Sequence, residues 1–191
     1  MSIKTIFQQS GFWRDSSAAA AVEFAIVAPF LVVVLINAVS FFDGFRGDRV
    51  VSRTNTVVLD LLTREQGAID DDDLDELIAI AEALAGKYVD NGFTLVLTSV
   101  RNTWDSEENP DIDLRWSISN DSSAVLTQDD IDAMTLPSMQ EGDTAIISSL
   151  TTEYTPAIVG ELSGEFTLSD YLIRRPRYVT EIDCSSDSGK C

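Results

Sequence analysis

Histidine is absent from the 191 residues of this sequence, and basic residues are scarce, with 13 Lys and Arg against 32 Asp and Glu. Without histidine, Ser-His-Asp and Cys-His catalytic arrangements are excluded, and so are most zinc sites. The net charge of −19 repels nucleic-acid phosphates, so we expect no nucleic acid among the partners. The few charges upstream of Asp43 cancel, and the acidic character therefore belongs to the segment that follows.

Only two cysteines occur, Cys184 and Cys191, in the polar segment IDCSSDSGKC. A short disulfide loop can close there, whereas a metal site would need further ligands that this segment lacks. Basic residues flank both sides of the apolar run described next, so they do not decide the orientation. We predict a Cys184–Cys191 disulfide, which places the acidic domain outside the cytoplasm.

A long apolar run extends from Ala18 to Phe42, and its only formal charge is Glu23. At ~1.5 Å per helical residue, about 20 residues cross a hydrocarbon core of ~30 Å, so the run can span a membrane. A cleaved secretory signal fits less well, because its apolar region typically has only ~7–15 residues. A buried core helix is the other alternative, although such helices are seldom apolar all round over this length.

The span divides the chain into four predicted segments: a cytoplasmic leader (1–18), a transmembrane helix (19–42), a stalk helix (43–66) and an acidic extracytoplasmic domain (67–191). The stalk segment begins in a stretch, FDGFRGD, that we expect to be flexible. Its apolar pairs begin at Val50, Val57 and Leu61 and predict an amphipathic helix, with Gly67 at its end.

The acidic domain begins with DDDDLDELIAIAEALAG, which predicts a second helix ending at Gly86. Its predicted apolar face consists of Leu74, Leu77, Ile78, Ala81 and Leu84. The four leading aspartates raise the alternative of calcium binding, and we leave it open. Helix capping accounts for them better, because the spacing of a calcium loop, with its Gly and final Glu, is missing.

Strand patterns follow this helix. FTLVLTSV from Phe93 and the alternation from Ile112 to Ile118 predict an antiparallel pair around Asn109-Pro110. DTAIISSLTTEYTP, EFTLSDYLI and RYVTEI predict three more strands after a short helical turn in QDDIDAM. Trp104 and Trp116 are expected in the core. These elements predict an α+β fold, a long amino-terminal helix and a small antiparallel sheet packed against helix.

The residues AAAAVEFAIVAP, followed by the apolar run, resemble the amino-terminal signature of TadE-like pseudopilins from the tight-adherence (Tad/Flp) branch of type IV pilus systems. In that family a Gly precedes four small or apolar residues and Glu-Phe, and a prepilin peptidase cuts after the Gly. The resemblance places the cut between Ala18 and Ala19, with Ala18 in the Gly position. It also implies a pilin-like fold.

The resemblance gives two residues of the run a role. It implies that Glu23 pairs with the terminal amine of a neighbouring subunit and sets the axial register, since an isolated charge is costly in an apolar filament core. The alternative is a Glu23 solvated at the headgroup boundary. Pro29 is expected to kink the helix, although Pro is also tolerated in membrane spans.

The function expected from the resemblance is that of a minor pilin or pseudopilin that assembles, primes or tips a Tad pilus and has a role in adhesion. The implied location is the bacterial inner membrane, single-pass, with the acidic domain periplasmic or extracellular. The implied partners are the membrane, prepilin peptidase, other pilins or pseudopilins and the Tad assembly platform. We expect no enzymatic activity, cofactor or metal.

Two alternatives remain. The first is an uncleaved, single-pass accessory protein of a Tad secretion system whose acidic domain binds a ligand or partner. The second is a membrane-anchored hydrolase that uses paired carboxylates, but the acids are scattered over helix starts and loops and form no recognisable site.

Overall fold

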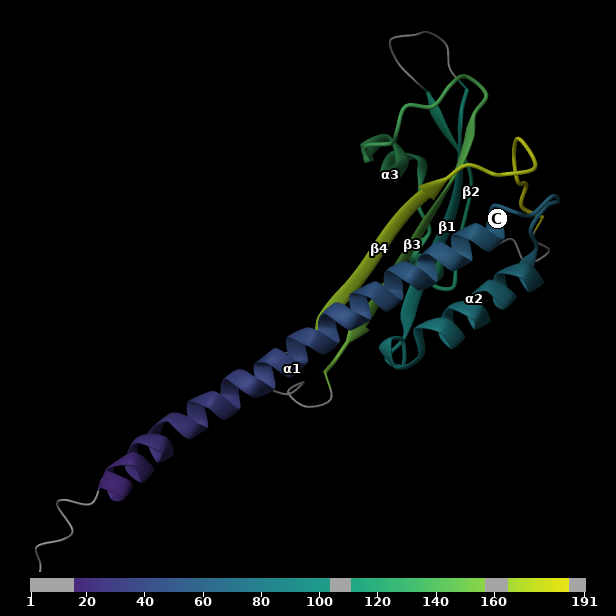
Figure 1. The fold of residues 1–191 in the computed structure, drawn as a ribbon. Coiled ribbons are helices and arrows are strands. Elements are labelled where there is room, and N and C mark those ends of the chain that lie inside the picture. Colours follow the sequence, from purple (N-terminus) through teal and green to yellow (C-terminus); the bar gives the residue numbers. More distant parts are fainter. Residues whose placement is uncertain (1–15, 104–110, 157–164, 186–191) are drawn as a thin grey trace, which may run out of the picture. The chain divides into compact units, whose positions relative to one another are not determined.

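The longest element of the computed structural model is helix α1, Ser16–Leu62, and the structure describes residues 16–103, 111–156 and 165–185 (Figure 1). The chain divides into two compact units, Met1–Phe42 and Asp43–Cys191. Helix α1 contributes to both units. The residues predicted to form a stalk therefore belong to the same unit as the sheet.

The first unit presents its apolar side chains to the outside. Phe24, Phe30 and Leu35 are 68%, 70% and 64% exposed, and the most apolar window of the helix has no buried residue. Ala19–Leu62 is the one helix in the described part of the chain that is long and apolar enough to cross a membrane. The sequence prediction of one such helix is confirmed at this level.

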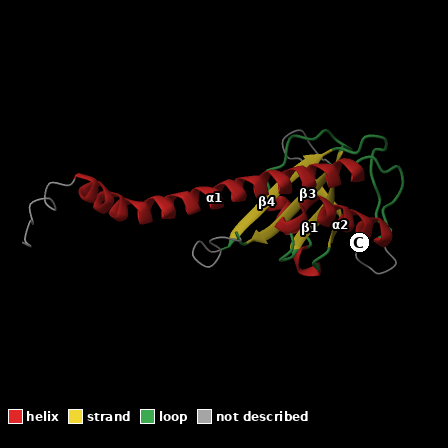
Figure 2. Ribbon diagram, turned by 60° about the horizontal axis from the view of Figure 1, so that its bottom comes forward, coloured by secondary structure: helices red, strands yellow, loops and turns green. Residues whose placement is uncertain are grey.

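The second unit is built on a four-stranded antiparallel sheet (Figure 2). The strands are β1 (Phe93–Asn102), β2 (Ile112–Ser119), β3 (Thr144–Tyr154) and β4 (Phe166–Arg174), and their order in the sheet is β2-β1-β3-β4. The predicted pairing of the first two strands is confirmed, with Leu97 opposite Ile118. The register shifts beside Val100, where β2 has an extra residue, Arg115.

One face of this sheet is covered by residues 43–62 of α1 and by helix α2, Asp71–Ala85. From α1, Val51, Val58, Leu59 and Leu62 recur at helical spacing and are at most 1% exposed. They join alternate residues of the strands, among them Leu95, Leu97, Ile146, Leu150 and Trp116, in the main core. The α+β architecture predicted from the sequence is therefore present.

Helix α2 begins as capping predicts. The Asp73 N–H donates to the Asp70 carboxylate (2.9 Å), and the Asp70 N–H donates to the Asp73 carboxylate (3.0 Å). Gly86 follows the helix with a positive φ of 52°, which other residues rarely adopt. The prediction is wrong for one residue of the apolar face, Leu84, which is 46% exposed. In the last turn of α2 the buried residues are Ala81 and Ala85.

The opposite face of the sheet carries a smaller core beneath helix α3, Gln128–Ala133, which confirms the helical turn predicted in QDDIDAM. Ile131 of α3 packs on Val100, Ala145 and Ile147 of the sheet. Two short 3-10 turns, Gly86–Tyr88 and Ser122–Ala124, complete the helical elements of the described chain.

The segment RYVTEI was predicted as a strand, and this is wrong. Residues 175–183 form no strand, and the only ladder contact nearby is the isolated bridge between Ile69 and Cys184. The segment instead crosses the end of the main core. The Arg177 N–H donates to the Thr63 carbonyl (2.9 Å), and the Trp116 indole donates to the Ile182 carbonyl (2.7 Å). Its backbone partners are therefore distributed over several elements and do not form one ladder.

Two expectations about α1 are also corrected. FDGFRGD is helical and not flexible, because Asp43 is bonded to the rest of the unit and Gly47 lets the helix approach Tyr88 closely. The helix ends at Leu62 and not at Gly67, since the next carbonyl, that of Thr63, accepts the hydrogen bond from Arg177.

Candidate functional site

The residues of the predicted peptidase signature lie in the first turns of α1. Ala18 and Ala19 are both helical, and the side chains of Ala19 and Glu23 are exposed. Pro29 lies inside the helix, which continues on both sides of it. The kink predicted at Pro29 and the roles predicted for Ala18, Ala19 and Glu23 stay predictions, because each depends on a peptidase, a membrane or a second subunit.

A second group of polar residues lies where the second unit begins. The Asp43 carboxylate accepts hydrogen bonds from Lys87 (3.0 and 3.1 Å), from Tyr88 (3.1 Å) and from Tyr154. The two tyrosine rings are 4.9 Å apart, and the Lys87 ammonium lies 4.8 Å from the centroid of the Tyr88 ring. We call these four residues the Asp43 cluster.

The Asp43 cluster perturbs its own ionisation. The hydrogen bond from Tyr154 is the main cause that lowers the pKa of Asp43 below its usual value. The hydrogen bond to Asp43 raises the pKa of Lys87, while burial and the same carboxylate raise the pKa of Tyr88 and Tyr154. The tyrosines therefore stay protonated at neutral pH, and the cluster joins the first turn of the second unit to β3 and to the 3-10 turn that follows α2.

A third polar group is buried between α1 and the sheet. The Asn55 amide donates to the Ser148 carbonyl (3.3 Å) and to the Asp170 carboxylate (2.9 Å), and its oxygen accepts from the Ser148 hydroxyl (2.5 Å). Asn55 and Ser148 have no exposed surface. Since a buried amide must be paired, this group sets the position of α1 along β3 and β4.

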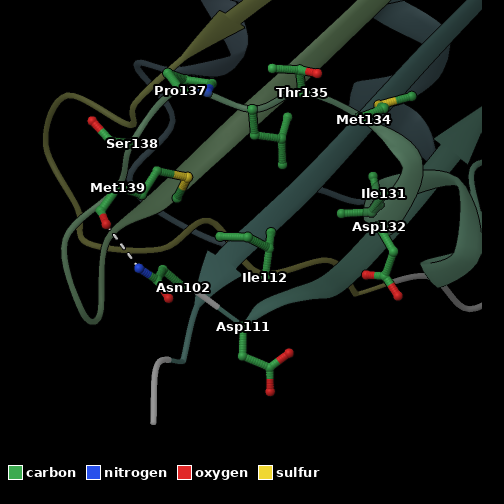
Figure 3. Close-up of a pocket in the computed structure, with 11 residues that line it drawn as sticks. Asn102, Asp111, Ile112, Ile131, Asp132, Met134, Thr135, Pro137, Ser138 and Met139 are labelled. Carbon is green, nitrogen blue, oxygen red and sulfur yellow. Dashed lines mark hydrogen bonds between the residues drawn. The ribbon is translucent and has the colours of Figure 1, made fainter. Parts of the chain in front are cut away.

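A cavity of about 760 Å³ lies on the α3 side of the sheet (Figure 3). Its walls include the apolar side chains of Ile112, Ile131 and Met139, with Asp111 and Asp132 beside them. Asn102 and Met139 both line the cavity, and the Asn102 amide donates a hydrogen bond to the Met139 carbonyl (2.8 Å). Among the described residues that line the cavity, no nucleophile is hydrogen-bonded to a base.

The other predicted sites are placed only in part. Within the described ranges, no three acidic or sulfur ligands gather as a metal site would require. The backbone of Cys184 forms the isolated β-bridge with Ile69. Cys191 lies outside the described residues, so the disulfide between Cys184 and Cys191 stays a prediction. Trp116 is in the core, as predicted, at 6% exposure, whereas Trp104 lies outside the described residues.

Neither the Asp43 cluster nor the Asn55 group was predicted from the sequence. A signal for Asn55 was present, because it lies four residues from both Val51 and Leu59 and so interrupts the buried face of an amphipathic helix. No comparable signal existed for the Asp43 cluster, whose members are brought together from positions 43, 87, 88 and 154 only by the fold.

Comparison with protein-family models, with curated proteins and with solved structures finds no match to this chain.

Proposed function

We propose that this chain is a minor pilin or pseudopilin of a Tad-type pilus, processed by a prepilin peptidase and held in the bacterial inner membrane with its acidic domain outside. The observation that carries the proposal is one carboxylate, Glu23, near the start of a helix whose apolar side chains are exposed. A soluble monomer seldom exposes so large an apolar surface, so these side chains call for a membrane or other apolar helices.

The position of Glu23 gives the proposal its chemistry. Cleavage between Ala18 and Ala19 would create a new terminal amine four residues before the carboxylate, about one helical turn away. In an apolar surrounding, each of these charges is costly alone and is stabilised by an opposite charge on a neighbouring subunit. Such a pair favours one axial register between subunits over the others.

The architecture of the second unit is compatible with a pilin-like role. Residues 43–62 of α1 form part of the main core, so a force on this segment is transmitted directly to the sheet. The Asn55 group and the Asp43 cluster add polar contacts along the same segment. A subunit held in a filament by α1 would therefore present a firmly attached acidic domain to the outside, where partner subunits, the Tad assembly platform or an adhesion ligand would meet it.

Co-expression of the full chain with its prepilin peptidase tests the proposal. We expect the chain to lose residues 1–18 and to begin at Ala19, as read by mass spectrometry of envelope protein. Ala18→Gly should speed the cut and Ala18→Leu should block it, whereas Ala25→Leu, an apolar change beyond the cut, should do neither. Glu23→Gln should leave the cut nearly intact but impair incorporation into filaments, because the shape survives and the charge is lost.

An intact Met1 terminus in cells with active peptidase would eliminate the processed pilin. It would favour the second candidate, an uncleaved membrane-anchored accessory protein of a Tad secretion system, whose binding site would be sought in the acidic domain. The observation in favour of this candidate is the cavity of about 760 Å³ beside α3, with its apolar walls and two aspartates.

A further inference from the structure

Three arginines follow each other along the outer side of α1 in the second unit. Arg46, Arg49 and Arg53 are exposed, and at 100° per residue they fall within roughly 60° of arc. The buried residues Val51 and Val58 occupy the opposite side of the same helix. We call the three the arginine stripe; it extends over ~10 Å of helix.

The arginine stripe is unusual because its charges are unpaired. In the described chain after Phe42, each of the other basic side chains has a carboxylate within ion-pair distance, namely Arg64, Lys87, Arg101, Arg115, Arg174, Arg175 and Arg177. The stripe makes no ion pair with any residue that the structure describes. It is therefore the one positive surface of these ranges that remains available to an external anion.

A complementary surface lies on α2. Its exposed acids, Asp72, Asp75, Glu76 and Glu82, fall within roughly 120° of arc and extend over ~15 Å, again opposite the buried side of the helix. They too form no ion pair with a described residue. We call them the acidic face of α2.

We propose that the arginine stripe is a docking surface for the acidic face of α2 on a second copy of this chain. With a net charge of −19, two copies repel each other over most of their surfaces, so a contact is favoured only where the stripe meets an acidic surface. The same charge opposes approach of the domain to an anionic lipid surface, which is the competing occupant.

The geometry permits both contacts in one pair. Residues 43–62 of α1 and α2 cover the same face of the sheet (Figures 1 and 2), so both charged surfaces point away from the sheet on that side. Two copies facing each other can therefore place each stripe on the other's acidic face, as a two-fold arrangement requires. The contact uses neither Ala18 nor Glu23, so it stands or falls separately from the proposed processing.

A charge exchange between full-length copies tests the docking. Two differently tagged copies are co-expressed, extracted in a nonionic detergent and co-purified through one tag. We expect Arg46→Glu, Arg49→Glu and Arg53→Glu together in both copies to reduce recovery of the second tag by about tenfold, as repulsion replaces attraction. Asp72→Lys, Asp75→Lys, Glu76→Lys and Glu82→Lys in both copies should do the same.

When the copy with the three Arg→Glu changes is co-expressed with the copy with the four acid→Lys changes, recovery of the second tag should return to near the wild-type level. Each reversed surface then meets a surface of opposite charge. The matched control is Ser122→Glu, Ala133→Glu and Gln140→Glu, compared with Arg46→Gln, Arg49→Gln and Arg53→Gln. The three control positions are exposed and lie between β2 and β3, in the segment that carries α3 on the opposite face of the sheet. Both sets make the net charge more negative by the same amount, and only the second should weaken pairing. Wild-type pairing should also fall in 1 M salt, where the screening length is only about 3 Å.

The proposal is overturned if wild-type copies do not co-purify at low salt, or if the exchanged pair is recovered no better than either variant alone. A photo-reactive phenylalanine analogue in place of Arg49, activated in membranes, decides the occupant. Adducts to α2 of the copy that carries the second tag support the docking, whereas adducts to lipid or to another protein contradict it.

Discussion

The two segments of α1 treat their apolar residues in opposite ways. In residues 19–42 the large apolar side chains are exposed, with Phe24 at 68% and Phe30 at 70%, whereas in residues 43–62 Val58 and Leu59 have no exposed surface. The second segment also contains the charged residues Asp43, Arg49 and Asp60, while the first contains only Glu23. One segment therefore depends on an apolar surrounding that the described chain does not supply, and the other on its own sheet.

The comparison separates two meanings of an apolar helix. The helix that is long and apolar enough to cross a membrane continues from Ala19 to Leu62, without a break at the start of the second unit. The boundary is set by pattern: apolar residues all round in the first segment, and on one face in the second. Substitutions that act differently on the two segments test this division.

The largest effect is expected in the main core. Leu59→Ala should lower the free energy of unfolding by about 2–5 kcal/mol, because it leaves a cavity between α1 and the sheet. Leu35→Ala removes the same atoms from a side chain that is 64% exposed, and it should change the stability of the domain by less than about 0.5 kcal/mol. Denaturation of both full-length variants in detergent measures the difference. Equal losses would show that the two segments are not distinct.

Local patterns predicted the elements well, because each depends on neighbours in the sequence. The acids at the start of α2 and the glycine after it predicted both of its limits. β-Branched and aromatic residues predicted β1, and alternation predicted β2. RYVTEI shows where such patterns fail. Its β-branched and aromatic residues are typical of a strand. However, the Glu181 carboxylate accepts hydrogen bonds from Arg101 (2.9 Å) and Arg115 (2.5 Å). The segment therefore crosses the end of the core and does not pair with an edge strand of the sheet.

The candidate site was less predictable than the fold. The signature around Glu23 is contiguous and can be read directly, but its chemistry depends on molecules outside this chain. The Asp43 cluster and the Asn55 group depend on long-range contacts, such as those of Asp43 with Tyr154 and of Asn55 with Asp170. Nothing near Asp43 in the sequence indicates which residues the fold brings to it. The arginine stripe lies between these two cases. The spacing of its arginines can be read from the sequence, but only the structure shows that they form no ion pair with a described residue.

Two glycines near the start of the second unit give a smaller effect, of opposite sign. A Cβ on Gly47 would lie 2.9 Å from Leu168 and from the Tyr88 ring, whereas nothing lies within 4 Å of one on Gly44. Gly44→Ala should stabilise the domain by up to about 1 kcal/mol through helix propensity. Gly47→Ala should destabilise it by about 1–3 kcal/mol relative to Gly44→Ala, because Tyr88 is held by Asp43 and cannot easily move. Equal stabilisation of both variants, measured by the same denaturation, would contradict the close packing of α1 at Gly47.

The smallest effect concerns the Asp43 cluster and depends on pH. Because hydrogen bonding lowers the pKa of Asp43 in the folded state, its contribution to stability is present above the unfolded pKa and is lost as pH falls through the folded pKa. Asp43→Asn should therefore be less stable than wild type near neutral pH, and the difference should shrink as the pH falls below about 4, the usual pKa of an Asp side chain. Asp90→Asn, at an exposed carboxylate to which no described residue is bonded, corrects for the loss of one negative charge. If the wild-type advantage over Asp43→Asn persisted unchanged in acid, the carboxylate would not be the acceptor that joins α1 to Lys87, Tyr88 and Tyr154, and the first turn of the second unit would be held by packing alone.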